Sequence, residues 1–255
     1  MTASAEALAR APRDRSFDAV FRWGVFFALI CLAAVVLWDF GYLLYIYAAD
    51  TSQISAVITV IFVGFSFYCL YLLLSLAPEL RAIGSITAQM QTGSPIVDEG
   101  GVLRAGTYKL PPKSAVAEHL RDVLLKYRND PEGDREVLLQ SMASPMRARI
   151  RIGMITADVL YKLGLLGTVI GFIVMLGSIS QLGEFEVETM RGAMQAMSSG
   201  MAISLLTTVT GLVCGTLLRM QFVMVEGVVS QILRRTVRLT EVFIIPDLKK
   251  AAARV

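Results

Sequence analysis

The chain has 255 residues, 55% of them hydrophobic, and its 24 Lys and Arg residues barely outnumber its 21 Asp and Glu residues. This composition favours a membrane protein over a water-soluble domain. The net charge of +3 lies in blocks rather than along a continuous basic face, which argues against nucleic-acid binding. The three cysteines fall inside apolar runs and His119 is the only histidine. The chain therefore lacks the residues for a zinc site, a disulfide framework or a Cys/His catalytic pair.

Four windows of the sequence are long and apolar enough to cross a membrane, which takes about 20 residues. Spans one (residues 23–48) and two (54–77) are joined by a short polar turn and predict a helical hairpin. Spans three (157–180) and four (197–218) are joined by a short acidic segment and predict a second hairpin. We therefore expect an all-α, polytopic membrane protein with four transmembrane helices.

The orientation of these spans follows from Lys and Arg, which collect on the cytoplasmic side of a membrane. They are plentiful in residues 1–22, 78–156 and 219–255, whereas the two short turns together carry a single arginine. We expect a cytoplasmic N-terminus, a cytoplasmic helical segment over 78–156 and a cytoplasmic C-terminal helix over 219–255. Transmembrane hairpins occupy 23–77 and 157–218. Both termini are then cytoplasmic, and the spans continue into the cytoplasm as helices.

The polar middle segment carries its own local signals. Gly100-Gly101 lies in a Gly- and Pro-rich stretch and favours a short hairpin. Ser114 is placed to cap a helix with an apolar face, and Asp130-Pro131 is typical of the start of the next helix. His119 falls in this charged region, where we expect it on a solvated surface.

Spans three and four each present one face of small and hydroxyl residues at helical spacing. The members are Gly164, Gly167, Thr168 and Gly171 in span three, and Gly200, Ser204, Thr207, Thr208, Gly211 and Gly215 in span four. Such faces allow helix backbones to approach closely. Hydroxyl groups facing a shared cavity also line water or ion paths. The pattern favours packing, and one stripe is able to serve both purposes.

Three charged residues lie within or beside the spans. Asp39 follows Trp38 in an aromatic belt, which favours an interfacial position over a proton relay. Asp158 and Lys162 are four residues apart at the start of span three, and they fit either a local ion pair or charges in a vestibule. No enzyme motif is present, and no carboxylate lies on the small-residue faces. A proton path would therefore need a carboxylate from a partner helix.

Two runs, Leu163–Phe172 and Gly200–Leu212, resemble the signature helices of the MotA/TolQ/ExbB proton-channel family. They occur in the right order, in adjacent spans separated by a short outer loop. Their amino-acid sequences are closer to the TolQ and ExbB branch, whereas the extra N-terminal hairpin is more like MotA. The ExbB branch has a Glu in the Gly-x-Ala-Glu motif of its last span, where this chain has Ile203.

The resemblance implies a pentameric ring of this subunit around a dimer of a single-span partner of the ExbD, TolR or MotB kind, which supplies the protonatable Asp. It places pore hydroxyls at Thr168 and Thr208, with Thr207 and Ser204 beside them and the six glycines packing helices at the pore. We expect an ion channel and stator subunit, coupled to protons, in a motor of the bacterial inner membrane. Lipid surrounds it, and neither a metal nor a cofactor is expected. The alternative is a non-conducting membrane scaffold or transporter-associated subunit.

Overall fold

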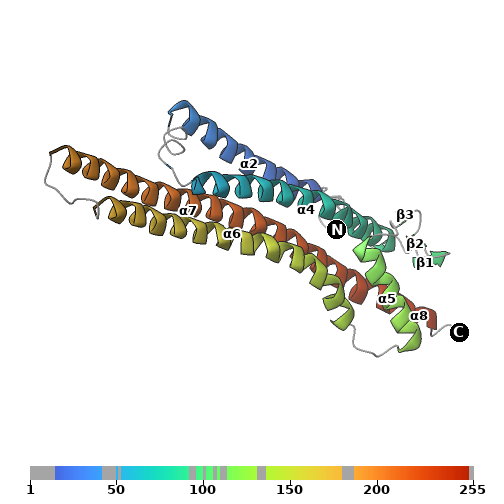
Figure 1. Ribbon diagram of the computed structural model, residues 1–255. Coiled ribbons are helices and arrows are strands. Elements are labelled where there is room, and N and C mark those ends of the chain that lie inside the picture. The colour runs from blue at the N-terminus through green and yellow to red at the C-terminus, as the bar shows by residue number, and fades with distance from the viewer. Residues whose placement is uncertain are drawn as a thin grey trace, which may run out of the picture. The chain divides into compact units, whose positions relative to one another are not determined.

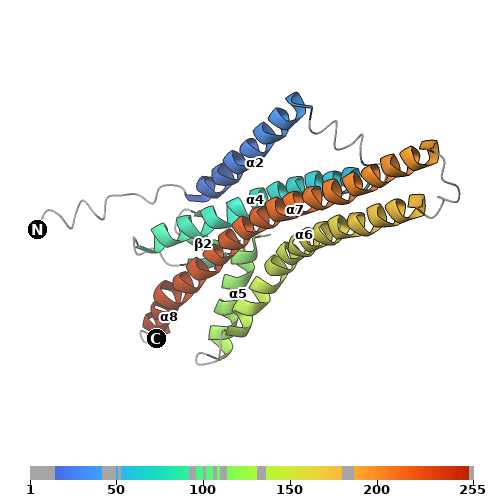
Figure 2. The same cartoon turned by 90° about the vertical axis from the view of Figure 1, so that its left-hand side faces the viewer.

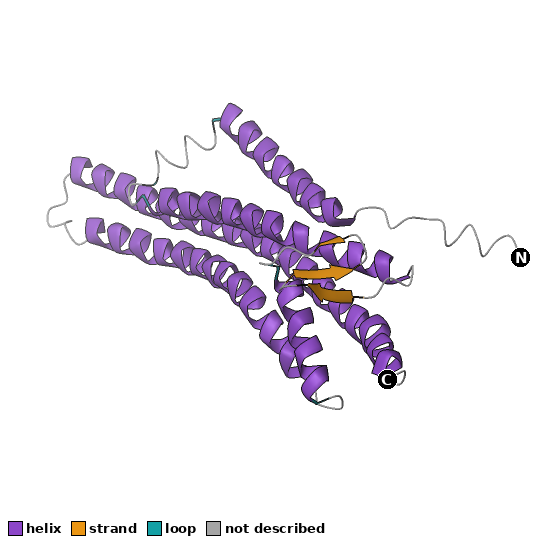
Figure 3. Ribbon diagram, turned by 90° about the vertical axis from the view of Figure 1, so that its right-hand side faces the viewer, coloured by secondary structure: helices purple, strands orange, loops and turns teal. Residues whose placement is uncertain are grey.

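The computed structural model describes residues 15–41, 50, 53–91, 96–99, 102–105, 108–109, 114–130, 136–179 and 187–252. Over these residues the protein consists of long helices and one small sheet (Figures 1 and 3). The helices are α2 (Arg15–Asp39), α4 (Ile54–Gln91), α5 (Ala115–Asn129), α6 (Glu136–Ile179), α7 (Val187–Arg238) and α8 (Ile245–Ala252), with a π-helix (Leu239–Ile244) between the last two. The strands are β1 (Ile96–Glu99), β2 (Val102–Ala105) and β3 (Tyr108–Lys109). The all-α fold class is confirmed, with this sheet as an addition.

Four of the described helices are long and apolar enough to cross a membrane, as predicted, and the candidate spans are Val20–Asp39, Ile54–Met90, Glu136–Gly177 and Met190–Lys249. The last three exceed what a crossing needs. Helix α4, with 38 residues, is roughly 57 Å long at 1.5 Å per residue, whereas the hydrocarbon core of a bilayer is about 30 Å thick. Each of these helices therefore has length for a crossing and for a further stretch outside it.

The chain divides into two compact units. The first, called the span unit here, comprises Trp23–Leu70 and Arg151–Val223. The second, called the peripheral unit, comprises Met1–Arg22, Tyr71–Ile150 and Met224–Val255. Helices α2, α4, α6 and α7 contribute residues to both units. Residues 23–77 and 157–218, predicted as transmembrane hairpins, overlap the span unit in sequence.

In the span unit, α2 packs on α4 through aromatic side chains. The Trp23 ring stacks on Phe27 with centroids 5.0 Å apart, and Phe27 lies 6.4 Å from Phe67 of α4. Trp23 is buried, but most other described side chains of α2 are exposed, and most of these are apolar. Asp50 precedes α4 and its carboxylate accepts a 2.7 Å hydrogen bond from the Ser55 N–H. The exposed apolar surface of α2 suits contact with lipid.

In the peripheral unit, α5 begins where the sequence predicts. Ser114 has an extended backbone, and its hydroxyl accepts a hydrogen bond from the Ala117 N–H, which confirms it as the N-cap. Glu79 of α4 completes the cap from another helix. Its carboxylate accepts hydrogen bonds from the Ser114 hydroxyl at 2.6 Å and from the Ala115 and Val116 N–H groups at 2.9 and 3.3 Å. The N-terminal donors of α5 are thus satisfied by a charged acceptor.

Other predictions for this segment have mixed outcomes. Strands β1 and β2 pair antiparallel on either side of Gly100-Gly101, which confirms the hairpin, although the two glycines lie outside the described residues. Asp130 is the C-cap of α5, where its N–H donates to the Lys126 carbonyl at 2.7 Å, and Pro131, expected to start the next helix with it, lies outside the described residues. The next helix begins at Glu136. The expectation of a solvated His119 is also wrong, because only 5% of its surface is exposed.

Span four and the C-terminal segment form one helix, because α7 is continuous from Val187 to Arg238. Beyond it the backbone widens to the π-helix, in which the Ile245 N–H donates to the Thr240 carbonyl. Pro246 follows directly, and a proline has no N–H with which to continue the hydrogen-bond ladder. Pro246 lies in the first turn of α8.

Candidate functional site

Within the span unit, α6 and α7 lie side by side (Figures 1 and 2) and their contact is made by glycines. A Cβ atom on Gly211 would lie 2.7 Å from the Gly164 Cα and 2.9 Å from the Leu160 carbonyl oxygen. A Cβ atom on Gly200 would lie 2.8 Å from the Gly171 carbonyl oxygen. These are backbone atoms, which cannot rotate away. The two helices therefore approach as closely as glycine allows.

The other predicted small residues extend the same contact. A Cβ atom on Gly167 would collide with the side chain of Thr207, and one on Gly215 would lie 3.1 Å from the Ala157 carbonyl oxygen. Further along, Gly153 of α6 accommodates the ring of Phe222. All six predicted glycines thus lie where α6 meets α7 of the same chain.

Hydroxyl groups tie the two helices together at the level of Thr168. The Ser204 hydroxyl donates to the Thr168 carbonyl at 3.0 Å, and the Thr208 hydroxyl lies 3.2 Å from the Gly164 carbonyl and 2.9 Å from the Ser204 carbonyl. Ser204 and Thr207 are buried, and the Thr207 hydroxyl donates to the Ile203 carbonyl of its own helix at 2.8 Å. The structure therefore places Ser204 and Thr207 inside the contact between the helices.

Thr168 and Thr208 differ from these two, because each is only half-buried. The Thr168 hydroxyl donates to the Leu165 carbonyl of its own helix. Their neighbours along the helix surfaces, Leu165, Leu205 and Leu212, are exposed. Thr168 and Thr208 therefore lie at the edge of the contact, beside a face that the described part of the chain leaves uncovered. This surface is called the open face of α6 and α7.

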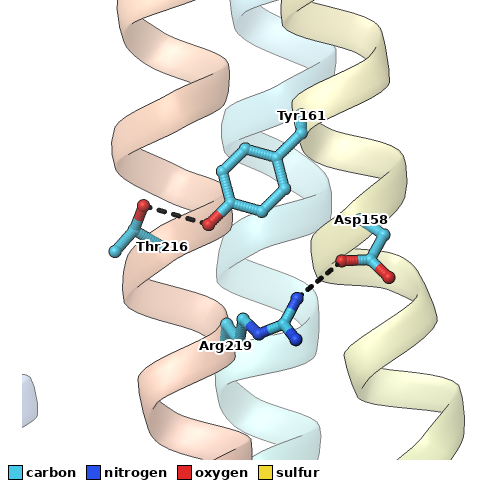
Figure 4. Close-up of polar contacts among 4 residues, drawn as sticks. All are labelled: Asp158, Tyr161, Thr216 and Arg219. Atoms are coloured by element: carbon cyan, nitrogen blue, oxygen red, sulfur yellow. Dashed lines mark hydrogen bonds and ion pairs between the residues drawn. The ribbon is translucent and has the colours of Figure 1, made fainter.

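Two further side-chain pairs join the helices at the edge of the open face (Figure 4). The Tyr161 hydroxyl and the Thr216 hydroxyl are 3.0 Å apart, and the Arg219 guanidinium is 3.0 Å from the Asp158 carboxylate. The side chains of Arg219 and Asp158 are 56% and 51% exposed. In Figure 4 both pairs bridge from one helix to the other, one above the other. Polar contacts thus continue along the helix pair beyond the threonines.

The remaining predicted charges are placed differently. Asp158 pairs with Arg219 on the neighbouring helix instead of with Lys162, four residues away, so the structure does not contain the local ion pair. Lys162 is exposed on α6. Asp39 is exposed at the last residue of α2, directly after the exposed Trp38.

Comparison with known families supplies the deciding observation. The model of the MotA/TolQ/ExbB proton channel family matches residues 109–237, just over half of the chain. The chain belongs to the MotA/TolQ/ExbB family. Comparisons with curated proteins and with solved structures found no match.

MotA/TolQ/ExbB membership identifies the chain as a membrane subunit of the proton-channel and stator type. The matched region extends from β3 through α5 and α6 and includes nearly all of α7. It therefore contains the whole contact between α6 and α7, whereas α2 and α4 lie outside it. The family is one of channel proteins and not of enzymes.

Three residues of the open face were missed by sequence reasoning: Tyr161, Thr216 and Arg219. A signal for them was available once the second hairpin of this MotA/TolQ/ExbB protein had been predicted. In an antiparallel hairpin, residues later in α6 lie beside residues earlier in α7, and residues earlier in α6 lie beside residues later in α7. The pairing of Gly164 with Gly211 then places Asp158 opposite the first residues after span four, where Arg219 lies.

Proposed function

We propose that this chain is the channel subunit of an inner-membrane motor that converts ion-motive force, carried by protons, into mechanical work. In this proposal it forms a pentameric ring around a dimer of a single-span partner, with both termini in the cytoplasm. The ring lies in lipid, with α6 and α7 turned inward. The observation that carries the proposal is the open face, on which the Thr168 and Thr208 hydroxyls lie beside exposed leucines rather than inside the chain.

The structure supports this arrangement because α6 and α7 satisfy their close packing within one chain. The glycines, Ser204 and Thr207 are used in that contact, so we assign these residues to packing around the path. Hydroxyls on the remaining face are uncharged, and they are able to stabilise a partner's carboxylate in a low-dielectric site as it gains and loses a proton.

The open face also offers room for a partner helix. Next to Leu205, a surface hollow of about 440 Å³ is lined by residues of α7 alone, and most of them are apolar. They are Met194, Met197, Ser198, Met201, Ala202 and Leu205. Methionine side chains adapt to irregular surfaces and suit a helix that turns within a ring. A transmembrane partner helix therefore fits this end of the face by its chemistry.

The experiment that tests the proposal replaces Thr168 with valine, which keeps the volume and removes only the hydroxyl. Its hydroxyl bonds only to its own helix, so the packing of α6 on α7 should survive. Thr208→Val is less clean, because the Thr208 hydroxyl also contacts the Gly164 carbonyl of α6. A polar contact worth about 1 kcal/mol or more in the conducting state is lost, so proton flux through the reconstituted complex should fall severalfold or more, with Thr168→Ser retaining part of it.

Thr210→Val is the matched control. Its hydroxyl also donates to its own helix, to the Leu206 carbonyl at 2.9 Å, but it lies on another face of α7. It should conduct normally. Normal flux in Thr168→Val and Thr208→Val complexes would instead favour the second candidate, a non-conducting scaffold whose small residues only pack helices. In that case the glycine contact between α6 and α7 is the observation that supports the scaffold function.

A further inference from the structure

The polar groups of the open face form a column along α6 and α7. On α6, Asp158, Tyr161 and Thr168 follow each other at intervals of three and seven residues, which places them on one side of the helix. On α7, Arg219 and Thr216 lie on the same side as Thr208 by the same spacing rule. The exposed Leu165 and Leu212 lie between the threonines and the Tyr161–Thr216 pair.

This column ends in a charged pair that its own chain does not shield. Asp158 and Arg219 are each about half exposed, yet exposed apolar side chains lie beside them on the same helices, Ile155 and Val159 on α6 and Met220 and Val223 on α7. Charged groups on membrane helices face water or a protein interior and not lipid. An exposed ion pair of this kind contributes little to stability. Stabilising the contact between α6 and α7 therefore does not explain why these two charges are present.

We propose that Asp158, oriented by Arg219, is the cytoplasmic acceptor for protons that leave the level of Thr168 and Thr208. This inference rests on the proposed function and names the exit side of the same path. The proton bonds to a carboxylate oxygen of Asp158, which becomes a neutral carboxylic acid, while Arg219 keeps its charge and loses its ionic partner. Release of the proton to water restores the carboxylate and the ion pair, and no other reactant is required.

Tyr161 and Thr216 fill the space between the threonines and the acceptor. Each hydroxyl both donates and accepts a hydrogen bond, and the two lie 3.0 Å apart across the helix pair. Together with water they connect the two ends of the column. Tyr161→Phe keeps the ring against Gly215 and removes only the hydroxyl, so it should reduce flux without changing assembly.

The decisive variants alter the pair without removing its bulk. Asp158→Asn combined with Arg219→Gln leaves two neutral side chains that are still able to hydrogen-bond. Proton uptake is measured in liposomes that contain the chain with its partner, with a pH-sensitive dye inside and a potassium diffusion potential as driving force. Loss of a proton-transfer group lowers rates by about 100-fold or more, and this is the loss we expect for Asp158→Asn and for the double variant.

Exchanging the two charges, Asp158→Arg with Arg219→Asp, returns a carboxylate to the same place on the open face. Flux should recover to the wild-type range. Glu226→Gln, which neutralises an exposed carboxylate two turns further along α7, is the matched control and should conduct normally. Wild-type flux in the neutral double variant would overturn the inference, and so would an exchanged variant that assembles but does not conduct.

The same series separates this inference from the proposed function. If the wild-type complex carries no protons, the proposed function fails and this inference fails with it. If the wild type conducts and Thr168→Val lowers flux, but the neutral double variant conducts normally, only the role of Asp158 is refuted.

Discussion

Replacing Gly211 with alanine tests whether the glycine contact determines how closely α6 and α7 pack. The new Cβ would lie 2.7 Å from the Gly164 Cα and 2.9 Å from the Leu160 carbonyl oxygen, whereas ordinary van der Waals contact begins at 3.4 Å. Because both atoms belong to the backbone, the helices must separate by roughly half an ångström. Overpacking of this kind costs about 1–3 kcal/mol.

Part of that cost is offset because alanine stabilises a helix relative to glycine by about 0.5–1 kcal/mol. Taken at the middle of both ranges, the net loss for Gly211→Ala is about 1 kcal/mol. Gly64→Ala is the matched control in α4, since nothing lies within 4 Å of a Cβ atom there. Gly64→Ala should gain the stabilisation that alanine gives a helix relative to glycine, with no cost from packing.

The assay is the thermal unfolding midpoint of each purified variant in detergent, followed by size-exclusion chromatography with fluorescence detection. For a chain of this size each kcal/mol shifts the midpoint by roughly 2–4 °C, so Gly211→Ala should unfold about 2–4 °C below the wild type. Gly64→Ala should not unfold below the wild type. If the two variants have the same midpoint, backbone contact between Gly164 and Gly211 does not limit the packing.

Three other predictions concern topology and the peripheral unit. In a cysteine-free background, Met190→Cys should react with an impermeant thiol reagent in intact cells and Val137→Cys should not; the reverse pattern would refute the orientation. Glu79→Ala should lower the thermal midpoint, because charge-assisted hydrogen bonds to Ser114 and the first turn of α5, worth about 1.5–3 kcal/mol, are lost; an unchanged midpoint would show that this cap contributes nothing. Burial lowers the pKa of His119 below its ordinary 6.5, so the stability it contributes is present above pH 6.5 and lost as the pH falls. His119→Phe should therefore unfold at midpoints that depend less on pH between 8 and 5 than those of the wild type, and equal dependence would contradict this.

The spans and the small-residue faces could be predicted because they depend on periodicity within single helices. Gly164, Gly167 and Gly171 recur at helical spacing, and only close packing or a polar cavity makes such a face favourable in a membrane. The burial of His119 was also encoded in this way. It lies three residues after Val116 and four before Val123, both of which are buried, so it belongs to the apolar face of α5.

Contacts between distant residues could not be predicted in the same way. Glu79 caps α5 from a position 35 residues before Ser114, and nothing in the local sequence links the two. Asp158 had a plausible partner within its own helix in Lys162, but the structure pairs it with Arg219, 61 residues away. The choice between these partners depends on the register of α6 against α7, which the glycine contacts determine.

The structure separates the small residues that pack α6 on α7 from the hydroxyls at the edge of the open face, two groups that the sequence left combined. A helix has several faces, and in α7 Ser204 and Thr207 are buried towards α6 while Thr208, one residue on, is at the edge of the open face. Ile203, where the ExbB branch carries a Glu, is also buried. A carboxylate at that position would be inside the subunit, away from the open face. In the proposed path the proton therefore has two carboxylates to use, the partner's at the level of the threonines and that of Asp158 beyond them. The neutral hydroxyls of Tyr161 and Thr216 lie between the threonines and Asp158.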